Sequence, residues 1–192
     1  MTSTALRVIG IDPGSLRAGW AVVAGSASRP ELLACGRIAL SAAWSFERRL
    51  ASLHEEFLRV VTDAAPTHAA VEAPFHGVSA RAALQLAHAR GVMLAVLGIA
   101  GVSVTEYAPS TIKKAVTGQG RAEKSQVATM VRAILRRPDP LLREDVSDAA
   151  AAALCHMYRS GWQDRVASAP RARRSRVSMR APTSTSGRGE PA

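Results

Sequence analysis

The stretch Leu6-Arg7-Val8-Ile9-Gly10-Ile11-Asp12-Pro13-Gly14 decides the fold, because a β-branched, apolar run ends abruptly in an acid and a turn. Such a run is typical of a buried strand, and the Pro-Gly pair directly after it ends that strand. Two further strands are predicted over residues 19–23 and 32–40, with a short Gly- and Ser-containing loop after the first strand. The chain therefore opens as an antiparallel meander whose first strand ends at an acidic side chain.

After the meander, helices alternate with short strands. A helix is predicted from Phe46 because apolar residues recur at helical spacing, with Ser45 as its N-cap and Pro66 as its end. The same reasoning predicts the remaining strands over residues 69–72 and 102–107, and the remaining helices over residues 80–97, 110–116, 123–136 and 145–158. This order predicts an α/β fold in which a mixed sheet is flanked by helices.

The composition is that of a globular protein: the chain has 192 residues, of which 47% are hydrophobic. We expect no membrane span and no signal peptide, since no apolar run combines sufficient length with freedom from charge and residues 1–6 are short and polar. Cys35 and Cys155 lie far apart and no CxxC accompanies them, which argues against a disulfide framework or a zinc site. Together these features predict a cytoplasmic protein.

Positive charge is spread over the whole chain, whose formal net charge is +10. Residues 163–192 carry seven Arg against two acids, so the preceding part is also basic. Basic charge favours a polyanionic partner, although an arginine-rich composition alone also has non-functional origins. Because the periodicity ends near Trp162, we expect one folded domain over residues 1–162 and a basic, disordered tail over residues 163–192.

Four acids stand at positions where chemistry is expected. Asp12 and Glu72 each follow an apolar run, and a partly buried carboxylate is costly unless it is paired or metal-bound. Asp145 and Asp148 are three residues apart at the start of an apolar helix, so they share one face of it. If the first and fourth strands are parallel neighbours, the last helix can bring its two acids against Asp12 and Glu72.

Four carboxylates suit hard divalent ions such as Mg²⁺ or Mn²⁺, and two such ions can act together on a phosphodiester. Each acid also has a purely structural interpretation. Asp12 before Pro-Gly can be a turn residue, Glu72 a surface acid and Asp145 a helix N-cap. From the residues alone, the metal site is one of two open interpretations.

Five segments resemble the RuvC family of Holliday-junction endonucleases and follow the family's order and spacing. They are residues 9–15 (IGIDPGS), 72–75 (EAPF), 88–92 (HARGV), 118–127 (GQGRAEKSQV) and 145–150 (DVSDAA). The first segment by itself is shared with other ribonuclease H-like and actin-like proteins, whereas the fourth is the most specific. The similarity covers roughly residues 6–160, and it departs from the family at residues 73–74 and in the arginine-rich tail.

The resemblance implies a ribonuclease H-like fold with a five-stranded mixed sheet and helices on both faces. It implies a crossover junction endodeoxyribonuclease of DNA recombination and repair that acts as a homodimer and makes paired, symmetric nicks in four-way junctions. It also implies two Mg²⁺ ions per subunit, replaceable by Mn²⁺, and a RuvA/RuvB-like branch-migration complex as partner. The catalytic and metal-binding positions correspond to Asp12, Glu72, Asp145 and Asp148.

Basic residues around the loop at Gly118 and Gly120 are candidates for holding DNA phosphates. These are Lys113, Lys114, Arg121 and Lys124, of which Lys113 and Lys124 match DNA-contacting positions of the family. Phe75 either stacks on an unpaired base or packs in the core, and the resemblance favours stacking.

Three other functions are alternatives to the junction endonuclease. The first is a ribonuclease H-like nuclease of the YqgF type that acts on ribosomal RNA, and the segment at residues 122–126 argues against it. The second is an actin-like nucleotide-binding fold, for which the chain is too short to form two domains. The third is a non-catalytic junction-binding protein, which the presence of all four acids argues against.

Overall fold

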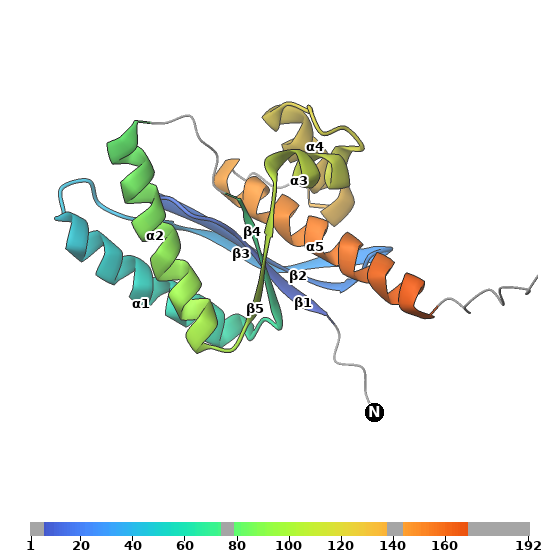
Figure 1. The fold of residues 1–192 in the computed structure, drawn as a ribbon, viewed down its shortest axis with the longest axis horizontal. Coiled ribbons are helices and arrows are strands. Elements are labelled where there is room, and N and C mark those ends of the chain that lie inside the picture. Colours follow the sequence, from blue (N-terminus) through green and yellow to red (C-terminus); the bar gives the residue numbers. More distant parts are fainter. Residues whose placement is uncertain (1–5, 74–78, 138–143, 169–192) are drawn as a thin grey trace, which may run out of the picture.

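The computed structural model describes residues 6–73, 79–137 and 144–168, with side chains described as far as residue 161. The described chain alternates strands and helices in the predicted order (Figure 1). The strands are β1 (Arg7–Asp12), β2 (Arg17–Ser26), β3 (Arg29–Ala39), β4 (His68–Glu72) and β5 (Ser103–Tyr107). The helices are α1 (Phe46–Ala64), α2 (Ala80–Ile99), α3 (Pro109–Thr117), α4 (Lys124–Leu135) and α5 (Glu144–Ser168).

The five strands form one mixed sheet in the order β3-β2-β1-β4-β5. The first three strands pair antiparallel as a meander, whereas β1 pairs parallel with β4, and β4 pairs parallel with β5. The predicted meander is confirmed, and the parallel pairing of β1 with β4, which the sequence leaves open, is present. Because β1, β4 and β5 run in the same direction, their carboxyl ends lie at one edge of the sheet, where ligand sites of such sheets are commonly found.

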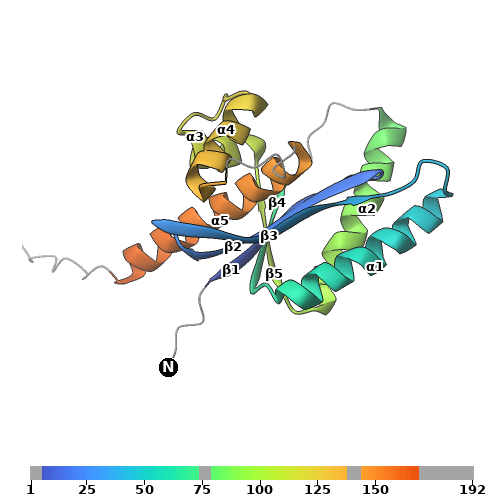
Figure 2. The same ribbon diagram turned by 180° about the vertical axis from the view of Figure 1, so that it is seen from behind.

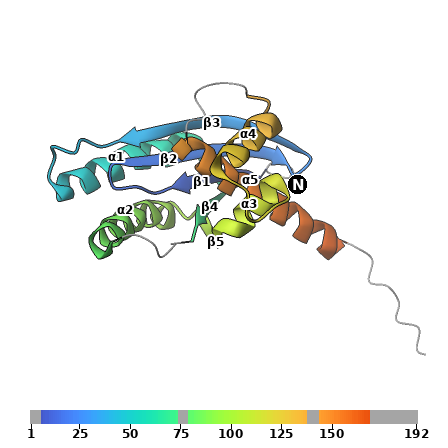
Figure 3. The same ribbon diagram turned by 90° about the horizontal axis from the view of Figure 1, so that it is seen from above.

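Helices cover both faces of the sheet, as Figures 2 and 3 show from behind and from above. The pair α1 and α2 covers one face, and α5 covers the other with α3 and α4 packed on it. Strand β1 is buried on both sides: Ile9 and Ile11 face the α1 and α2 side, and Val8 faces α5. This alternation is the period of two expected for a strand, and it makes β1 the centre of the fold.

The ends of the helices follow local signals. Ser45 accepts a hydrogen bond from the backbone N–H of Arg48 at 3.3 Å, as predicted for an N-cap. Helix α4 begins with a capping box in which the Gln126 side chain accepts from the backbone N–H of Glu123 at 2.9 Å. The box fixes the first turn of α4, and therefore the position of Lys124 at its start.

Helix α5 is longer than the sequence predicts. We expect a helix over residues 145–158, whereas α5 extends from Glu144 to Ser168 and so continues into the segment expected to be a tail. The helix can extend past the last apolar repeat because no proline interrupts the chain between residues 158 and 168. The domain boundary at residue 162 stays a prediction, and residues 169–192 lie outside the described part of the chain.

Helix α2 corrects the expectation that no segment has the length and composition of a membrane span. Residues 80–99 satisfy both criteria, with a mean hydropathy of 1.5 over the most apolar window. One side of α2 nevertheless belongs to the fold, because Ala89, Met93 and Leu97 are buried in the core under the sheet. The apolar composition of α2 therefore combines a core-facing side with an exposed side that has no partner among the described residues.

Candidate active site

Asp12 and Glu72 lie side by side at the carboxyl ends of adjacent parallel strands. Ile11 of β1 is in register with Val71 of β4, so the next residue of each strand is an acid. Both side chains are half-buried, between the sheet edge and the helices that cover it. Parallel pairing of β1 with β4 is the condition under which the sequence places these two acids together, and the structure has this pairing.

Asp145 and Asp148 are brought to the same edge by α5, which crosses the sheet in direct backbone contact. A Cβ added at Gly19 would overlap the carbonyl group of Asp145 and lie 3.0 Å from its Cβ. A Cβ added at Gly10 would overlap the carbonyl of Ala149 and lie 2.9 Å from the nitrogen of Ala153. Only glycine permits so close an approach of two backbones. Gly10 and Gly19 therefore set the distance between the sheet and the first turn of α5, which carries Asp145 and Asp148.

The four carboxylates act on one another electrostatically. The pKa of Asp12 is raised to about 7, first by burial and then by the charges of Asp148, Asp145 and Glu72 in that order of size, against a lowering by Lys124. Burial and then the charge of Asp148 also raise the pKa of Glu72. Like charges have this effect only at short range in a medium of reduced polarity. The fold therefore gathers the four acids into one negatively charged cluster.

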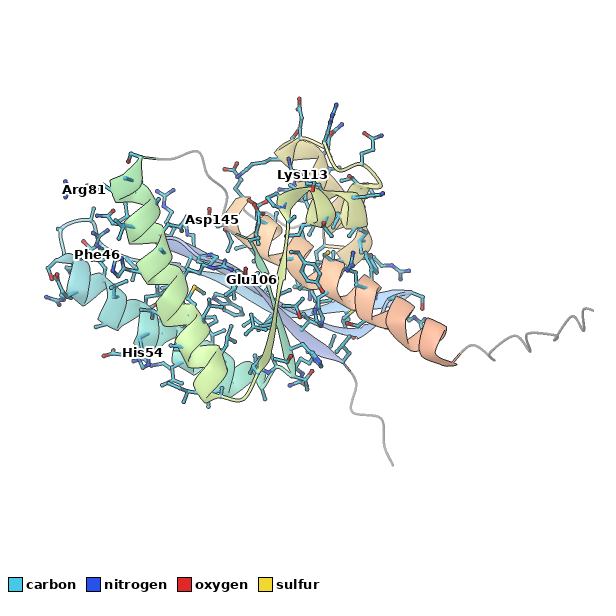
Figure 4. All side chains as sticks on the ribbon, viewed as in Figure 1. Phe46, His54, Arg81, Glu106, Lys113 and Asp145 are labelled. Carbon is cyan, nitrogen blue, oxygen red and sulfur yellow. The ribbon has the colours of Figure 1, made fainter. Side chains whose placement is uncertain are left out.

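Three cations border this cluster. The Lys124 ammonium donates to Asp148 Oδ2 at 3.3 Å and lies 3.9 Å from Glu144 Oε1, and the charge of Asp148 is the main reason why the pKa of Lys124 is raised. Arg37 Nη1 lies 4.0 Å from Asp145 Oδ2. Lys113 lies on α3, on the α5 side of the sheet, and its charge lowers the pKa of Glu72 (Figure 4). Lys113 and Lys124 therefore lie beside the carboxylates, and their contact with DNA stays a prediction.

The other predicted DNA-contacting residues lie elsewhere. Lys114 is exposed on a different side of α3 from Lys113, and Arg121 is exposed between α3 and α4. Neither is among the charges that shift the pKa values of Asp12 and Glu72. Phe75 falls within residues 74–78, which are outside the described residues, so its predicted stacking on DNA stays a prediction.

The donor set fits a hard divalent cation, although it is not a preformed cage. Within the described ranges, no three Asp, Glu, His or Cys side chains converge closely enough to hold an ion as they stand. Lys124 and Arg37 attract Asp148 and Asp145 in the arrangement described above. A divalent cation would neutralise these carboxylates in place of Lys124 and Arg37. Carboxylate oxygens are the ligands that Mg²⁺ and Mn²⁺ prefer.

Two arginines of the site are missing from the sequence prediction. Arg90 Nη1 donates to the Glu72 carbonyl at 2.7 Å, and its Nη2 lies 2.7 Å from Glu106 Oε1, so it ties the ends of β4 and β5 together. Arg37 reaches Asp145 from β3, opposite Gly19. Arg90 belongs to the HARGV segment, which was a usable signal, whereas Arg37 has no sequence motif around it.

The raised pKa of Asp12 makes a prediction about the metal-free protein. The folded state binds this proton between pH 4 and 7 and the unfolded state does not, so the free energy of unfolding falls as pH rises through this window. A rise from 3.8 to about 7 corresponds to a loss of at most about 4 kcal/mol, at about 1.4 kcal/mol for each pH unit. In EDTA at pH 8, Asp12→Asn should therefore unfold at a higher temperature than the wild type.

Thermal unfolding at pH 5 and pH 8 checks this, with Asp63→Asn on the exposed side of α1 as the matched change. Asp63→Asn should leave both melting temperatures unchanged. A melting temperature of Asp12→Asn at or below that of the wild type at pH 8 would show that ionised Asp12 carries no electrostatic cost.

Comparison with known proteins extends the similarity to nearly the whole chain. The sequence model of the family described as crossover junction endodeoxyribonuclease RuvC matches residues 8–156. A RuvC of Methylocella silvestris is 44% identical over 156 residues, which cover 81% of this chain and 88% of the relative. A RuvC of Sorangium cellulosum is 40% identical over 173 residues, which cover 89% of this chain and 96% of the relative.

The fold has a close counterpart among solved structures. A structure of Thermus thermophilus RuvC in complex with a Holliday junction substrate superimposes with a TM-score of 0.78 at 33% identity, covering 82% of this chain and 96% of that chain. The yeast mitochondrial resolvase Ydc2 shares the fold at 12% identity with a TM-score of 0.61. The predicted ribonuclease H-like arrangement, with its five-stranded sheet between two layers of helices, is confirmed.

Proposed function

The chain belongs to the RuvC family of crossover junction endodeoxyribonucleases, and from this premise we propose that it resolves Holliday junctions by metal-dependent, paired nicks. The observation that carries the proposal is the coupling of Asp12 to Asp148, Asp145 and Glu72 at one edge of the sheet. The four acids are only partly neutralised by Lys113, Lys124 and Arg37, so they need divalent cations before a phosphate can approach them. The same cluster argues against a purely DNA-binding role, because binding alone does not require it.

Asp12, Glu72, Asp145 and Asp148 would hold two divalent ions, Mg²⁺ or Mn²⁺. When bound, such ions activate the attacking water and stabilise the leaving oxygen of the phosphodiester. Asp12 is fixed at the end of β1, and Asp145 and Asp148 are fixed by the seating of α5 against Gly10 and Gly19. Rigid placement of this kind holds the reacting groups in register, which is a large part of the catalytic effect expected.

Lys113 and Lys124 would bind the DNA backbone beside the cut. Both act on the carboxylate cluster in the free protein, and Lys124 contacts Asp148 directly. Once cations neutralise the carboxylates, Lys124 is available for a phosphate oxygen and can position the strand. Arg90 holds the backbone of Glu72 and is expected to preserve the position of that carboxylate.

A substrate panel tests this function. We expect symmetric nicks in a synthetic four-way junction with Mg²⁺, no cleavage in EDTA, and restored cleavage when Mg²⁺ is returned. Linear duplex DNA of the same sequence and structured ribosomal RNA should be cut far more slowly. Faster cleavage of RNA than of the junction would favour the YqgF-type alternative, and tight junction binding without any nick would favour the non-catalytic one.

We also propose that the active protein is a homodimer formed through α2. The exposed side of α2 consists of apolar residues that recur at helical spacing. Among them, Leu84 is 57% exposed and Ile99 is 82% exposed. Gly91 and Gly98 have open space around them, so a second backbone can approach closely. An apolar helix face of this length marks an interface, and two-fold pairing of identical helices fits paired nicks on a two-fold junction. Ala87 and Ala95 continue this small-residue surface.

Leu84→Glu should dissociate the dimer, because it would bury an unpaired charge in the interface. We expect association weaker by about 10²-fold or more, measured by sedimentation equilibrium. Leu33→Glu, at an exposed leucine of β3, is the matched control and should leave the dimer intact. A Leu84→Glu protein that sediments as the wild-type dimer would exclude α2 as the interface.

Two further proposals rest on family membership alone. We propose that a branch-migration complex of the RuvA/RuvB kind delivers the junction. We also propose that the protein acts in the bacterial cytoplasm, where its DNA substrate is found.

A further inference from the structure

A cavity lies away from the carboxylates, between α3 and the C-terminal half of α5. Its volume is about 870 Å³, and it is open to solvent. Its lining includes Ser110 and Lys114 from α3, Gly120 from the following loop, and Tyr158 and Arg159 from α5. No acidic side chain is among the described residues that line it.

The cavity presents two cations without acidic partners. Ser110 and Lys114 are four residues apart on α3 and therefore share one face of that helix. Arg159 lies over the ring of Tyr107 at 5.8 Å from its centroid, a contact that holds the guanidinium while leaving its N–H groups available. Neither Lys114 nor Arg159 forms an ion pair within the part of the chain that is described. Two cationic residues and a serine that line one cavity supply the chemistry of a phosphate site.

The cavity lies at a defined distance from the cluster. Arg159 follows Asp148 by eleven residues on one continuous helix, which corresponds to about 16 Å along the helix axis. A DNA strand advances about 3.4 Å per nucleotide along a duplex, so this distance corresponds to about five nucleotides. Lys113, which acts on Glu72, is the chain neighbour of Lys114, so α3 links the two sites.

We propose that this cavity binds a backbone phosphate of a junction arm, about five nucleotides from the cut, through Lys114, Arg159 and Ser110. The proposal rests on the proposed function, since it assumes a DNA duplex beside the carboxylates. It assigns Lys114 to a contact separate from that of Lys113 and Lys124. It also explains why Lys114 is basic although it does not act on the active-site carboxylates.

Binding to junctions with one neutral linkage tests the site. Methylphosphonates replace single phosphates at each position up to eight nucleotides from the cut, and affinities are measured without Mg²⁺. We expect Lys114→Ala and Arg159→Ala each to bind the normal junction roughly five- to tenfold more weakly and to reduce the salt slope by about one. One neutral linkage should weaken the wild type and leave the double variant unaffected.

Arg59→Ala on α1 is the matched control, since it removes an exposed arginine on the opposite side of the sheet. It should bind every junction as the wild type does. Equal affinities for Arg159→Ala and Arg59→Ala would overturn the proposal, and so would weaker binding that does not depend on the position of the neutral linkage. A failure of the proposed function is distinguished by a separate cleavage assay, in which the wild type with Mg²⁺ would make no nicks.

Discussion

Replacing Asp12 or Asp148 by Asn should lower the rate of junction cleavage by at least about 10³-fold, while junction affinity stays nearly unchanged. Each substitution removes one negative charge and one ligand oxygen but keeps the shape of the side chain. The charges of the other three acids all act on Asp12, and Asp148 acts on both Asp12 and Glu72. The loss should therefore fall on the chemical step and leave binding, which depends on the basic surface, intact.

Single-turnover cleavage and binding to the same junction measure the two effects separately. Asp63→Asn is the control, because it makes the same chemical change on an exposed side of α1. Symmetric nicks by either Asn variant at a rate within tenfold of the wild type would show that the substituted acid is not a catalytic metal ligand. Loss of binding together with loss of cleavage would show instead that the acid serves the fold.

Gly19→Ala should reduce both stability and cleavage. The added methyl group would overlap the carbonyl of Asp145, so α5 must move away from β2. We expect a loss of about 1–3 kcal/mol in the free energy of unfolding, as for other overpacked interfaces. Displacement of the acid-bearing turn by about 1 Å should lower the cleavage rate by about 10²-fold at a temperature where the variant is fully folded.

Gly161→Ala is the matched control on the same helix. Its methyl group would meet only the Cβ of Ala27, at 3.0 Å, a contact that the turn between β2 and β3 can relieve. Cleavage by Gly161→Ala should equal that of the wild type. A Gly19→Ala protein that is fully active and as stable as the wild type would show that the backbone contact between α5 and β2 does not position Asp145.

The sheet and its acids could be predicted because the deciding signals are local. The apolar run before Asp12 and the run before Glu72 each mark a strand by composition alone, and the register of β1 with β4 then places the acids together. The pairing itself is a long-range fact. The order of elements leaves it open, the family resemblance implies only the fold that contains it, and no single residue encodes it.

The contacts that complete the site could not be predicted in the same way. Arg37 reaches Asp145 only because β3 lies next to β2 in register with Gly19, and no pattern around Arg37 reports this. The need for glycine at position 19 likewise arises from the close passage of α5. The end of α5 was misplaced because apolar periodicity ends near Trp162, whereas the helix continues to Ser168. These features depend on packing between elements distant in sequence.

We propose that four carboxylates from separate parts of the chain converge on two divalent ions. Crystals of the full-length protein soaked in Mn²⁺, with diffraction measured at the Mn absorption edge, test this most directly. We expect two anomalous peaks about 3.5–4 Å apart, within coordination distance of Asp12, Glu72, Asp145 and Asp148, and no peaks in Asp12→Asn crystals treated identically. Peaks elsewhere on the surface, with these four side chains unliganded at saturating Mn²⁺, would contradict the account.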